Sequence, residues 1–255
     1  MSIKPPRILV SNDDGINAHG IRTLEKIARE VSDDVWVVAP ETNQSGAAHS
    51  LTLARPLRVR RHDERRFSVD GTPTDCVLIA LQQIVQGPPV DLVLSGINHG
   101  ANLGEDVTYS GTVAAAMEAT LFKVPAIAFS QVCESRQHIK WATAERYAPR
   151  VIERLLSMPW PEDVLINVNF PDIFADEVQG IRVTSQGKRE ISDTLIERTD
   201  PRGEPYLWIG ALREEATHRQ GTDLAAINEG YVSVTPVHLD MTHHASFAAL
   251  RKLLE

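Results

Sequence analysis

The chain has 255 residues, and its apolar fraction of 42% and charged fraction of 24% are ordinary for a globular protein. The formal net charge of −8 argues against a protein that binds nucleic-acid duplexes or anionic membranes, because such partners require a basic face. No apolar run is long enough to cross a bilayer, and the first residues lack the apolar core of a signal sequence. Cys76 and Cys133 are isolated in apolar surroundings and predict buried thiols. Together these features predict a cytoplasmic protein without a membrane segment.

The first two thirds of the chain alternates short apolar runs with stretches of helical periodicity. Residues 7–12 and 35–39 indicate buried strands, and residues 20–31 between them carry apolar side chains at helical spacing. A strand, a helix and a second strand in this order predict a parallel, right-handed crossover. Similar patterns predict strands at 91–95, 126–130 and 164–168, helices at 74–86, 112–122 and 142–158, and a hairpin from 57–61 and 66–69. This alternation predicts an α/β fold with a Rossmann-like, doubly wound and mostly parallel sheet.

The pattern becomes richer in strands beyond about Pro171. Strand-like runs occupy 181–185, 206–209 and 232–237, and a helical pattern occupies 244–254. We therefore expect a Rossmann-like core over residues 1–171 and a β-rich C-terminal extension over residues 172–255, packed together as one domain.

Polar segments follow three of the predicted parallel strands. These segments are residues 11–15, 43–46 and 95–98. Ligands of open parallel sheets gather beyond the carboxyl ends of the strands, so we expect the three segments to meet at one site. Their shared location carries more weight than any one segment.

The adjacent residues Asp13 and Asp14 suggest a metal site. Two neighbouring carboxylates repel each other, and a divalent cation removes that repulsion while preferring hard oxygen ligands. The hydroxyl of Ser45 and the amide oxygen of Asn98 would extend the shell, leaving room for water and phosphate around Mg²⁺ or Mn²⁺. Taken alone, the aspartates favour a solvated Asp-Gly turn, and the two neutral residues favour turns or caps. The preceding strand and the shared location favour the metal site.

A second motif, residues 109–112, stands directly before a predicted helix. Ser110 and Thr112 offer hydroxyls, and Gly111 lets the backbone approach a ligand closely. Free N–H groups at a helix start form an anion site. The alternative is ordinary N-capping of the helix by Ser110. The Gly-Lys-Ser/Thr core of a Walker A motif is absent.

Motifs along the whole chain resemble one known family. They are Ile8-Leu-Val-Ser-Asn-Asp-Asp-Gly15, Ala39-Pro40 with Asn43-Gln-Ser-Gly46, Val69-Asp-Gly-Thr-Pro-Thr-Asp-Cys76, Ser95-Gly-Ile-Asn-His-Gly-Ala-Asn-Leu-Gly104, Tyr109-Ser-Gly-Thr112, and Thr235-Pro236 with Asp240. In this order they resemble the SurE family, the stationary-phase survival protein 5′-nucleotidases. The series is specific because it spans nearly all of the sequence.

The resemblance implies an activity and a set of site residues. Family members are divalent-metal phosphatases that act on nucleoside 5′- and often 3′-monophosphates, and some cleave short polyphosphate. The implied ligands of one Mg²⁺ or Mn²⁺ ion per subunit are Asp13, Asp14, Ser45 and Asn98. The implied phosphate or substrate contacts are Asn12, Gly46, Asn102, Ser110, Gly111 and Thr112. Asp240 and His244 match supporting residues near the site, through a shorter local similarity.

The implied reaction is hydrolysis of a phosphate monoester in the Rossmann-like catalytic core. The metal would neutralise the phosphate, and a metal-bound or carboxylate-activated water would attack in line, with Asp13 or Asp14 accepting its proton. One alternative is an aspartyl-phosphate intermediate, as in haloacid-dehalogenase-like phosphatases, but those use Asp-x-Asp rather than adjacent aspartates. A second alternative is a nucleotide sensor without catalysis, in which two acids facing a phosphate would make little sense without a metal.

The resemblance also implies a homodimer or homotetramer with exchanged C-terminal elements. Residues 189–205 are polar, and the flanking runs at 181–185 and 206–209 suggest a long protruding arm. An isolated two-stranded arm is marginally stable in water, so we expect a partner subunit to support it by symmetric exchange. The alternative is a mobile surface hairpin on a monomer.

Overall fold

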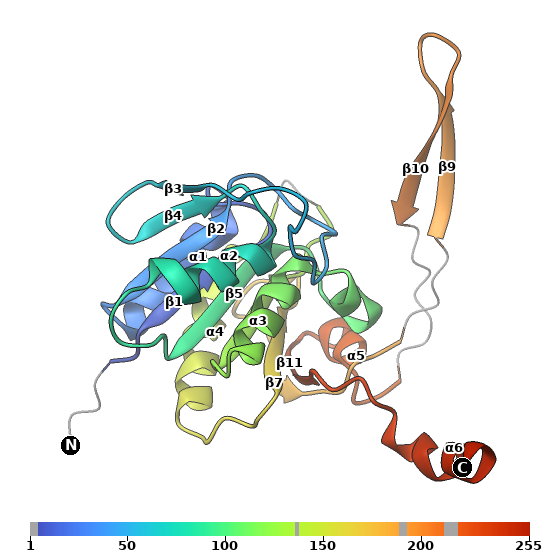
Figure 1. Cartoon of the computed structure of the whole chain (residues 1–255). Helices are drawn as coiled ribbons and strands as arrows, with labels where there is room; N and C mark the ends of the chain where they lie inside the picture. Colours follow the sequence, from blue (N-terminus) through green and yellow to red (C-terminus); the bar gives the residue numbers. More distant parts are fainter. Residues whose placement is uncertain (1–4, 136–137, 189–192, 212–218) are drawn as a thin grey trace.

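Parallel strands at the centre of one large sheet organise the fold (Figure 1). The computed structural model describes residues 5–135, 138–188, 193–211 and 219–255. In that part of the chain the sheet has nine strands in the order β3-β4-β2-β1-β5-β6-β7-β11-β8. The strands are β1 (Ile8–Ser11), β2 (Val35–Pro40), β3 (Val59–Arg61), β4 (Arg66–Val69), β5 (Leu92–His99), β6 (Ala126–Gln131), β7 (Val164–Phe170), β8 (Gly180–Val183) and β11 (Tyr231–His238). The six strands from β4 to β7 in this order run parallel, and β3 and β11 run antiparallel to their inner neighbours.

Helices cover both faces of the sheet. Helices α1 (His19–Val31) and α4 (Trp141–Leu156) lie on one face, and α2 (Pro73–Ile79) and α3 (Gly111–Leu121) lie on the other (Figure 1). Strand β2, which follows α1, lies on one side of β1. Strand β5, which follows α2 in the chain, lies on the other side of β1. The strand order therefore reverses between β1 and β5, and open α/β sheets bind their ligands beyond the carboxyl ends at such a point.

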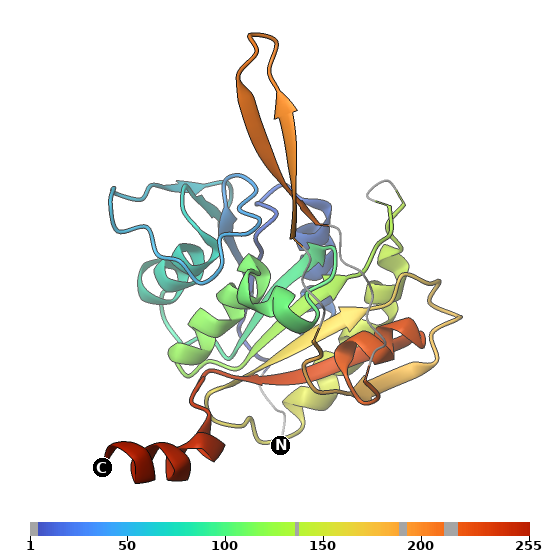
Figure 2. The ribbon, with the colours of Figure 1, turned by 90° about the vertical axis from the view of Figure 1, so that its right-hand side faces the viewer.

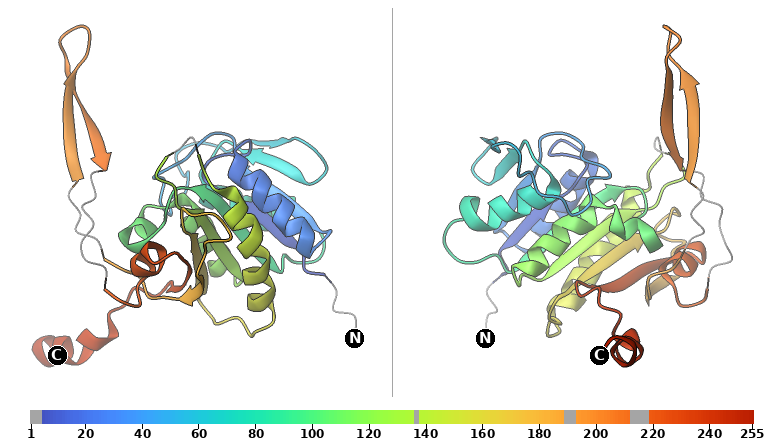
Figure 3. Two further views of the ribbon diagram at one scale, coloured as in Figure 1. Left: turned by 180° about the vertical axis from the view of Figure 1, so that it is seen from behind. Right: turned by 45° about the vertical axis from the view of Figure 1, so that its right-hand side comes forward.

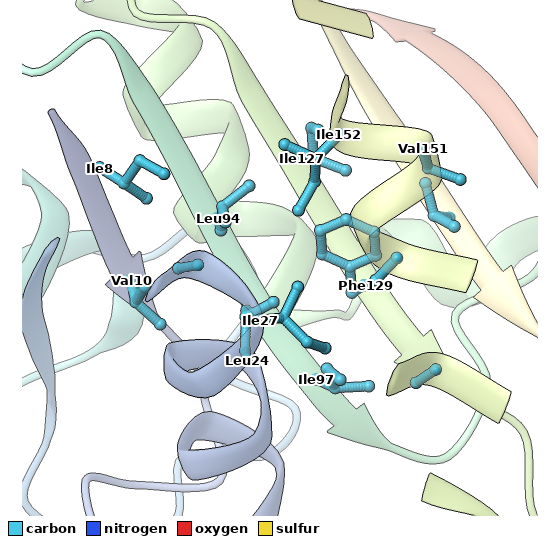
Figure 4. Packing of buried hydrophobic residues seen from close by; sticks show 14 of the residues in the cluster. Ile8, Val10, Leu24, Ile27, Leu94, Ile97, Ile127, Phe129, Val151 and Ile152 are labelled. Carbon is cyan, nitrogen blue, oxygen red and sulfur yellow. The ribbon is translucent and has the colours of Figure 1, made fainter. Parts of the chain in front are cut away.

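Alternating side chains divide the core into two clusters. Ile8 and Val10 face α1 and α4, whereas Leu9 faces α2 and α3, because successive strand residues point to opposite faces. Figure 4 shows Leu24 and Ile27 of α1 packed in the first cluster. Helix α3 is buried along nearly its whole length, and its run of alanines allows it to lie close to β5 and β6. Buried elements on both sides therefore fix the carboxyl ends of β1 and β5.

The C-terminal extension contains a separate hairpin and a terminal helix. Strands β9 (Asp193–Thr199) and β10 (Pro205–Ala211) pair only with each other, and Figures 1 and 2 show them standing away from the main sheet. Helix α5 (Asp223–Asn228) precedes β11, and α6 (Phe247–Leu254) projects at the end of the chain, as both views of Figure 3 show. The described residues include no helix that is long and apolar enough to cross a membrane.

The structure confirms the predicted α/β class and the mostly parallel Rossmann-like sheet, and it corrects three elements. The helix expected at 74–86 is α2 followed by a π-helical turn, Ala80–Ile84. The run at 181–185 does not form part of the arm, because β8 pairs with β11 at the edge of the main sheet. The arm instead uses β9, which lies within the polar segment 189–205, where no strand was predicted. Residues 189–192 of that segment lie outside the described residues.

Candidate functional site

The polar segments predicted to meet do surround one pocket beyond the carboxyl ends of β1 and β5. The pocket has a volume of about 330 Å³. Six of the predicted site residues line it: Asp13, Ser45, Gly46, Asn98, Asn102 and Ser110. His99, Asp106 and Tyr109 line it as well, although none of them was among the predicted site residues.

Asn12 shapes the turn that follows β1. Its Nδ2 donates to the carbonyl oxygen of Gly15 at 3.0 Å, while its Oδ1 is buried without a hydrogen-bond partner among the described residues. Gly15 has φ +99° and lies against Thr42, a conformation and a proximity that favour glycine. Asn12 therefore acts on the backbone of the turn, and it does not line the pocket.

Asp13 is 4% exposed and lies against the first turn of α3. The hydroxyl of Thr112 donates to its Oδ1, and a side chain at Gly111 would place a Cβ 2.8 Å from the Asp13 Cβ. Burial raises the pKa of Asp13 to about 6; hydrogen bonds from Thr112 oppose this change, and the charge of Asp14 adds to it. The site thus holds a carboxylate whose negative charge the described side chains compensate only in part.

Asp14 lies on the other side of the turn from Asp13. Its Oδ2 accepts a hydrogen bond of 3.1 Å from the backbone N–H of His99, which joins the end of β1 to the end of β5. Asp14 lines a second, larger pocket of about 570 Å³, and His99 lines both pockets. The two carboxylates therefore flank the boundary between two neighbouring cavities.

The two neutral predicted ligands, Ser45 and Asn98, donate hydrogen bonds to other groups of the same chain. The hydroxyl of Ser45 donates to Asn43 Oδ1 at 2.7 Å, and Asn98 Nδ2 donates to the carbonyl oxygen of Gly100 at 3.0 Å. Both side chains thereby keep oxygen lone pairs for another partner. With Asp13 and Asp14 they form an oxygen-only donor set, which suits a hard divalent cation. Among the described residues no group of three or more His, Cys, Asp or Glu side chains could hold a metal, so a metal here would depend on neutral oxygens.

The residues predicted to bind phosphate divide into two kinds. Ser110 caps α3, because its Oγ accepts from the backbone N–H of Val113 at 3.0 Å, yet it also lines the pocket. Thr112 is completely buried and directs its hydroxyl to Asp13. In this structure the Thr112 hydroxyl orients the carboxylate, and its contact with phosphate stays a prediction.

Asn102 is held by a buried amide network. Its Nδ2 donates to Ser130 Oγ at 2.7 Å, and its backbone N–H donates to Asn169 Oδ1 at 2.9 Å. Its carbonyl oxygen accepts from the side-chain amides of Asn167 and Asn169. The alternating asparagines of the otherwise apolar β7 were the sequence signal for this network, since buried amides require partners.

Two buried carboxylates anchor the loop at residues 41–54, which carries Ser45. Asp75 accepts from the backbone N–H of Thr52 at 3.0 Å and from its hydroxyl at 2.7 Å. Glu118 of α3 lies 2.9 Å from His49 Nε2. The loop is thereby attached to α2 and α3 at positions that the sequence analysis did not assign to the site.

Asp240 and His244 do not approach either pocket within a single chain. They contact each other at 3.0 Å on the exposed segment after β11. Because β11 runs antiparallel to β7, its carboxyl end lies at the opposite edge of the sheet from the pocket, where Leu239 N–H donates to the carbonyl oxygen of Asp163 just before β7. The expectation that both residues support the site is not met within one chain.

Asp75→Asn should loosen the 41–54 loop. The amide lacks the second acceptor oxygen that serves Thr52, and an unsatisfied buried group costs about 1–3 kcal/mol. We expect faster hydrogen exchange at the amide of Thr52 and a lower free energy of unfolding. Asp70→Asn is the matched control, because Asp70 accepts from Arg58 outside this loop. Unchanged protection of Thr52 in Asp75→Asn would contradict the proposed anchor.

Asp13→Asn should stabilise the metal-free protein at neutral pH. The folded-state pKa of about 6 exceeds the unfolded value near 3.8, so the free energy of unfolding falls as pH rises through this interval and stays lower above it. A neutral amide avoids the free-energy cost of ionising the buried carboxyl group. This cost lowers the free energy of unfolding by roughly 3 kcal/mol at pH 8 and vanishes below about pH 4. Urea unfolding in chelator at pH 4 and pH 8 measures the difference, with the exposed Asp33→Asn as control. A stability change independent of pH would refute this expectation.

Comparisons with known proteins agree on one family. The family model for survival protein SurE matches residues 8–193. The 5′-nucleotidase SurE of Paramagnetospirillum magneticum is 61% identical to this chain, over 96% of the chain and 94% of that protein. The protein of the same name from Parvibaculum lavamentivorans is 53% identical, over 98% and 92%. The crystal structure of the SurE protein from Aquifex aeolicus matches with a TM-score of 0.86 at 42% identity, covering 98% of this chain and all of that one. The chain belongs to the SurE family.

Proposed function

We propose that this protein is a 5′-nucleotidase that hydrolyses the phosphate monoester of nucleoside 5′-monophosphates with the help of a divalent cation. The observation that carries the proposal is the pocket around Asp13, where a buried carboxylate, neutral oxygen donors and the start of α3 meet. The relatives named 5′-nucleotidase SurE, at up to 61% identity over nearly the full chain, support the substrate class.

The cation would be held by Asp13, Asp14, Ser45 and Asn98. When bound, Mg²⁺ or Mn²⁺ supplies positive charge that neutralises phosphate oxygens during attack by water. The donor set fits such an ion because every donor is an oxygen, and because the pKa of Asp13 is raised where a cation would lower it. We propose one ion per subunit.

The residues of the chain would orient the reactants. Thr112 holds Asp13, and the backbone N–H of His99 holds Asp14, so that either carboxylate can accept a proton from the attacking water. The hydroxyl of Ser110 and the amide of Asn102 line the pocket and would contact phosphate oxygens. The glycines Gly46 and Gly111 leave room for the phosphate and for the approach of α3 to Asp13.

The finer properties of the family extend the proposal. We propose activity towards 3′-monophosphates and short polyphosphate as well, since the proposed contacts in the smaller pocket are all with a terminal phosphate group, which these substrates also carry. A cytoplasmic location remains a prediction from the sequence.

The exposed C-terminal elements support a homodimer or homotetramer with exchanged arms. On the hairpin, Trp208 is 63% and Ile209 is 81% exposed, and on α6 Leu253 is 78% exposed. Apolar side chains on an isolated hairpin and an isolated helix gain stability only by contact with another surface. A second copy of the chain would provide that surface by two-fold symmetry.

Removing either carboxylate charge should abolish phosphatase activity. We expect Asp13→Asn and Asp14→Asn each to lower kcat for AMP by at least about 100-fold in Mn²⁺, because each removes charge that would face the cation. Ser45→Ala should cause a smaller loss, since its ligand is neutral. Phosphate release with and without chelator is the measurement, and Asp33→Asn is the control. Near-normal turnover of both aspartate variants would show that the proposed metal site is wrong.

The exposed apolar side chains of β10 should matter for assembly. We expect Trp208→Ser combined with Ile209→Thr to lower the molar mass measured by light scattering at micromolar concentration, because the arm loses its contact area. Leu121→Ser replaces an exposed leucine on the body of the protein and serves as the control. An active monomer in the unmodified protein would rule out the proposed exchange, and an unchanged mass in the double variant would rule out the arm as its cause.

A further inference from the structure

We propose that the larger pocket beside the candidate catalytic pocket binds the nucleobase of the substrate, with His19 and Trp141 as its stacking surface. This inference rests on the proposed function. The pocket has a volume of about 570 Å³, within the range of about 300–1,000 Å³ that ligand sites occupy. Asp14, His19, Asn43, His99 and Trp141 are among its lining residues.

The two pockets share one lining residue and adjoin at two further pairs of residues. His99 lines both of them. Asp14 lines the larger pocket, while its neighbour Asp13 lines the smaller one. Asn43 of the larger pocket accepts the hydroxyl hydrogen of Ser45, which lines the smaller pocket. A molecule whose phosphate occupied the smaller pocket could therefore extend its remaining part across Asp14 into the larger one.

The wall of the larger pocket offers ring faces. The rings of His19 and Trp141 lie 5.2 Å apart between centroids and are tilted by 37°. Stacking of a base on an aromatic side chain contributes about 1–3 kcal/mol and tolerates different bases, because every base has a π-face. This wall thus suits a nucleobase better than a second phosphate.

Close packing fixes the position of that wall. A Cβ at Gly20 would lie 2.0 Å from the carbonyl oxygen of Ile97 and 3.3 Å from the Trp141 ring. The glycine therefore lets the start of α1 lie directly against β5 and beside α4. This contact places the backbones of His19 and Trp141 beside the same pocket, where their rings contact each other.

A second, independent observation concerns His99. Its Nε2 is buried and has no hydrogen-bond partner among the described residues. Buried polar atoms in folded proteins are nearly always paired, so this atom marks the wall between the two pockets as a place that lacks a polar partner. Nucleobases and ribose carry donors and acceptors that could pair with it after a small rotation of the ring.

The competing position for the base is Tyr109. This residue lines the smaller pocket and is 61% exposed, so a base could stack on its ring instead of entering the larger pocket. If the base enters the larger pocket, substitution of His19 should weaken its binding. If it stacks on Tyr109, substitution of Tyr109 should do so instead. The two arrangements can therefore be separated by comparing a substrate that has a base with one that lacks it.

The experiment measures kcat/KM for AMP and for ribose 5-phosphate in the full-length protein with Mn²⁺. We expect His19→Ala to lower the ratio of the two values by about 5- to 150-fold, the range that corresponds to about 1–3 kcal/mol of stacking. His19→Phe keeps a ring and should restore the ratio. The Ki of adenosine, as a competitive inhibitor of ribose 5-phosphate hydrolysis, should rise in His19→Ala and recover in His19→Phe. His62→Ala, at a histidine that pairs with Ser68 away from both pockets, is the control.

Each alternative result has a separate meaning. An unchanged ratio in His19→Ala, or a ratio that falls in Tyr109→Ala instead, would overturn the assignment of the larger pocket to the base. Loss of activity on both substrates to the same extent, without recovery in His19→Phe, would also overturn it, because His19 would then act on structure. If the unmodified protein released phosphate from neither substrate, the proposed function itself would fail.

Discussion

Burying the Asp13 carboxylate against the first turn of α3 takes a charged group out of water, and the rest of the site is arranged around that contact. The hydroxyl of Thr112 binds the carboxylate, and Gly111 allows the helix to approach it. These contacts offset only part of the desolvation, as the raised pKa shows. A cation would complete the compensation, so the electrostatics of the pocket and the proposed chemistry have the same origin.

Rigid elements hold the loops that complete this site. Asp75 and Glu118 attach the 41–54 loop to α2 and α3, and the amides of β7 hold Asn102. Polar groups in loops are precise only when their supports are themselves satisfied and packed. In the proposed function, the buried polar residues outside the pocket would therefore act as positioning groups, although none of them lines the pocket.

The C-terminal extension obeys different constraints from the core. Strand β11 completes the sheet and is largely buried, whereas the β9–β10 hairpin and α6 expose apolar side chains. The described residues of this chain do not cover the apolar side chains of the hairpin and of α6. The extension thus divides into a part that stabilises the sheet and a part that is free to meet another surface.

The sequence by itself determined the class of the fold and the edge of the sheet where the site lies. Strand and helix periodicities are local properties, and so is the placement of Asp13, Ser45 and Asn98 after apolar runs that become β1, β2 and β5. Short motifs such as residues 11–15 and 109–112 therefore selected loops that the tertiary structure brings to one pocket.

Only the tertiary structure decided which partner each polar group takes. Thr112 meets Asp13 across 99 residues of sequence, and no local pattern shows that its hydroxyl is already engaged. The antiparallel direction of β11 carries Asp240 to the far edge of the sheet, although its motif resembles that of a site residue. The pairing of β8 with β11, and the pocket between α1 and α4, likewise depend on how distant elements pack. Periodicity specifies which face of an element is buried, but strand order and direction determine what that face contacts.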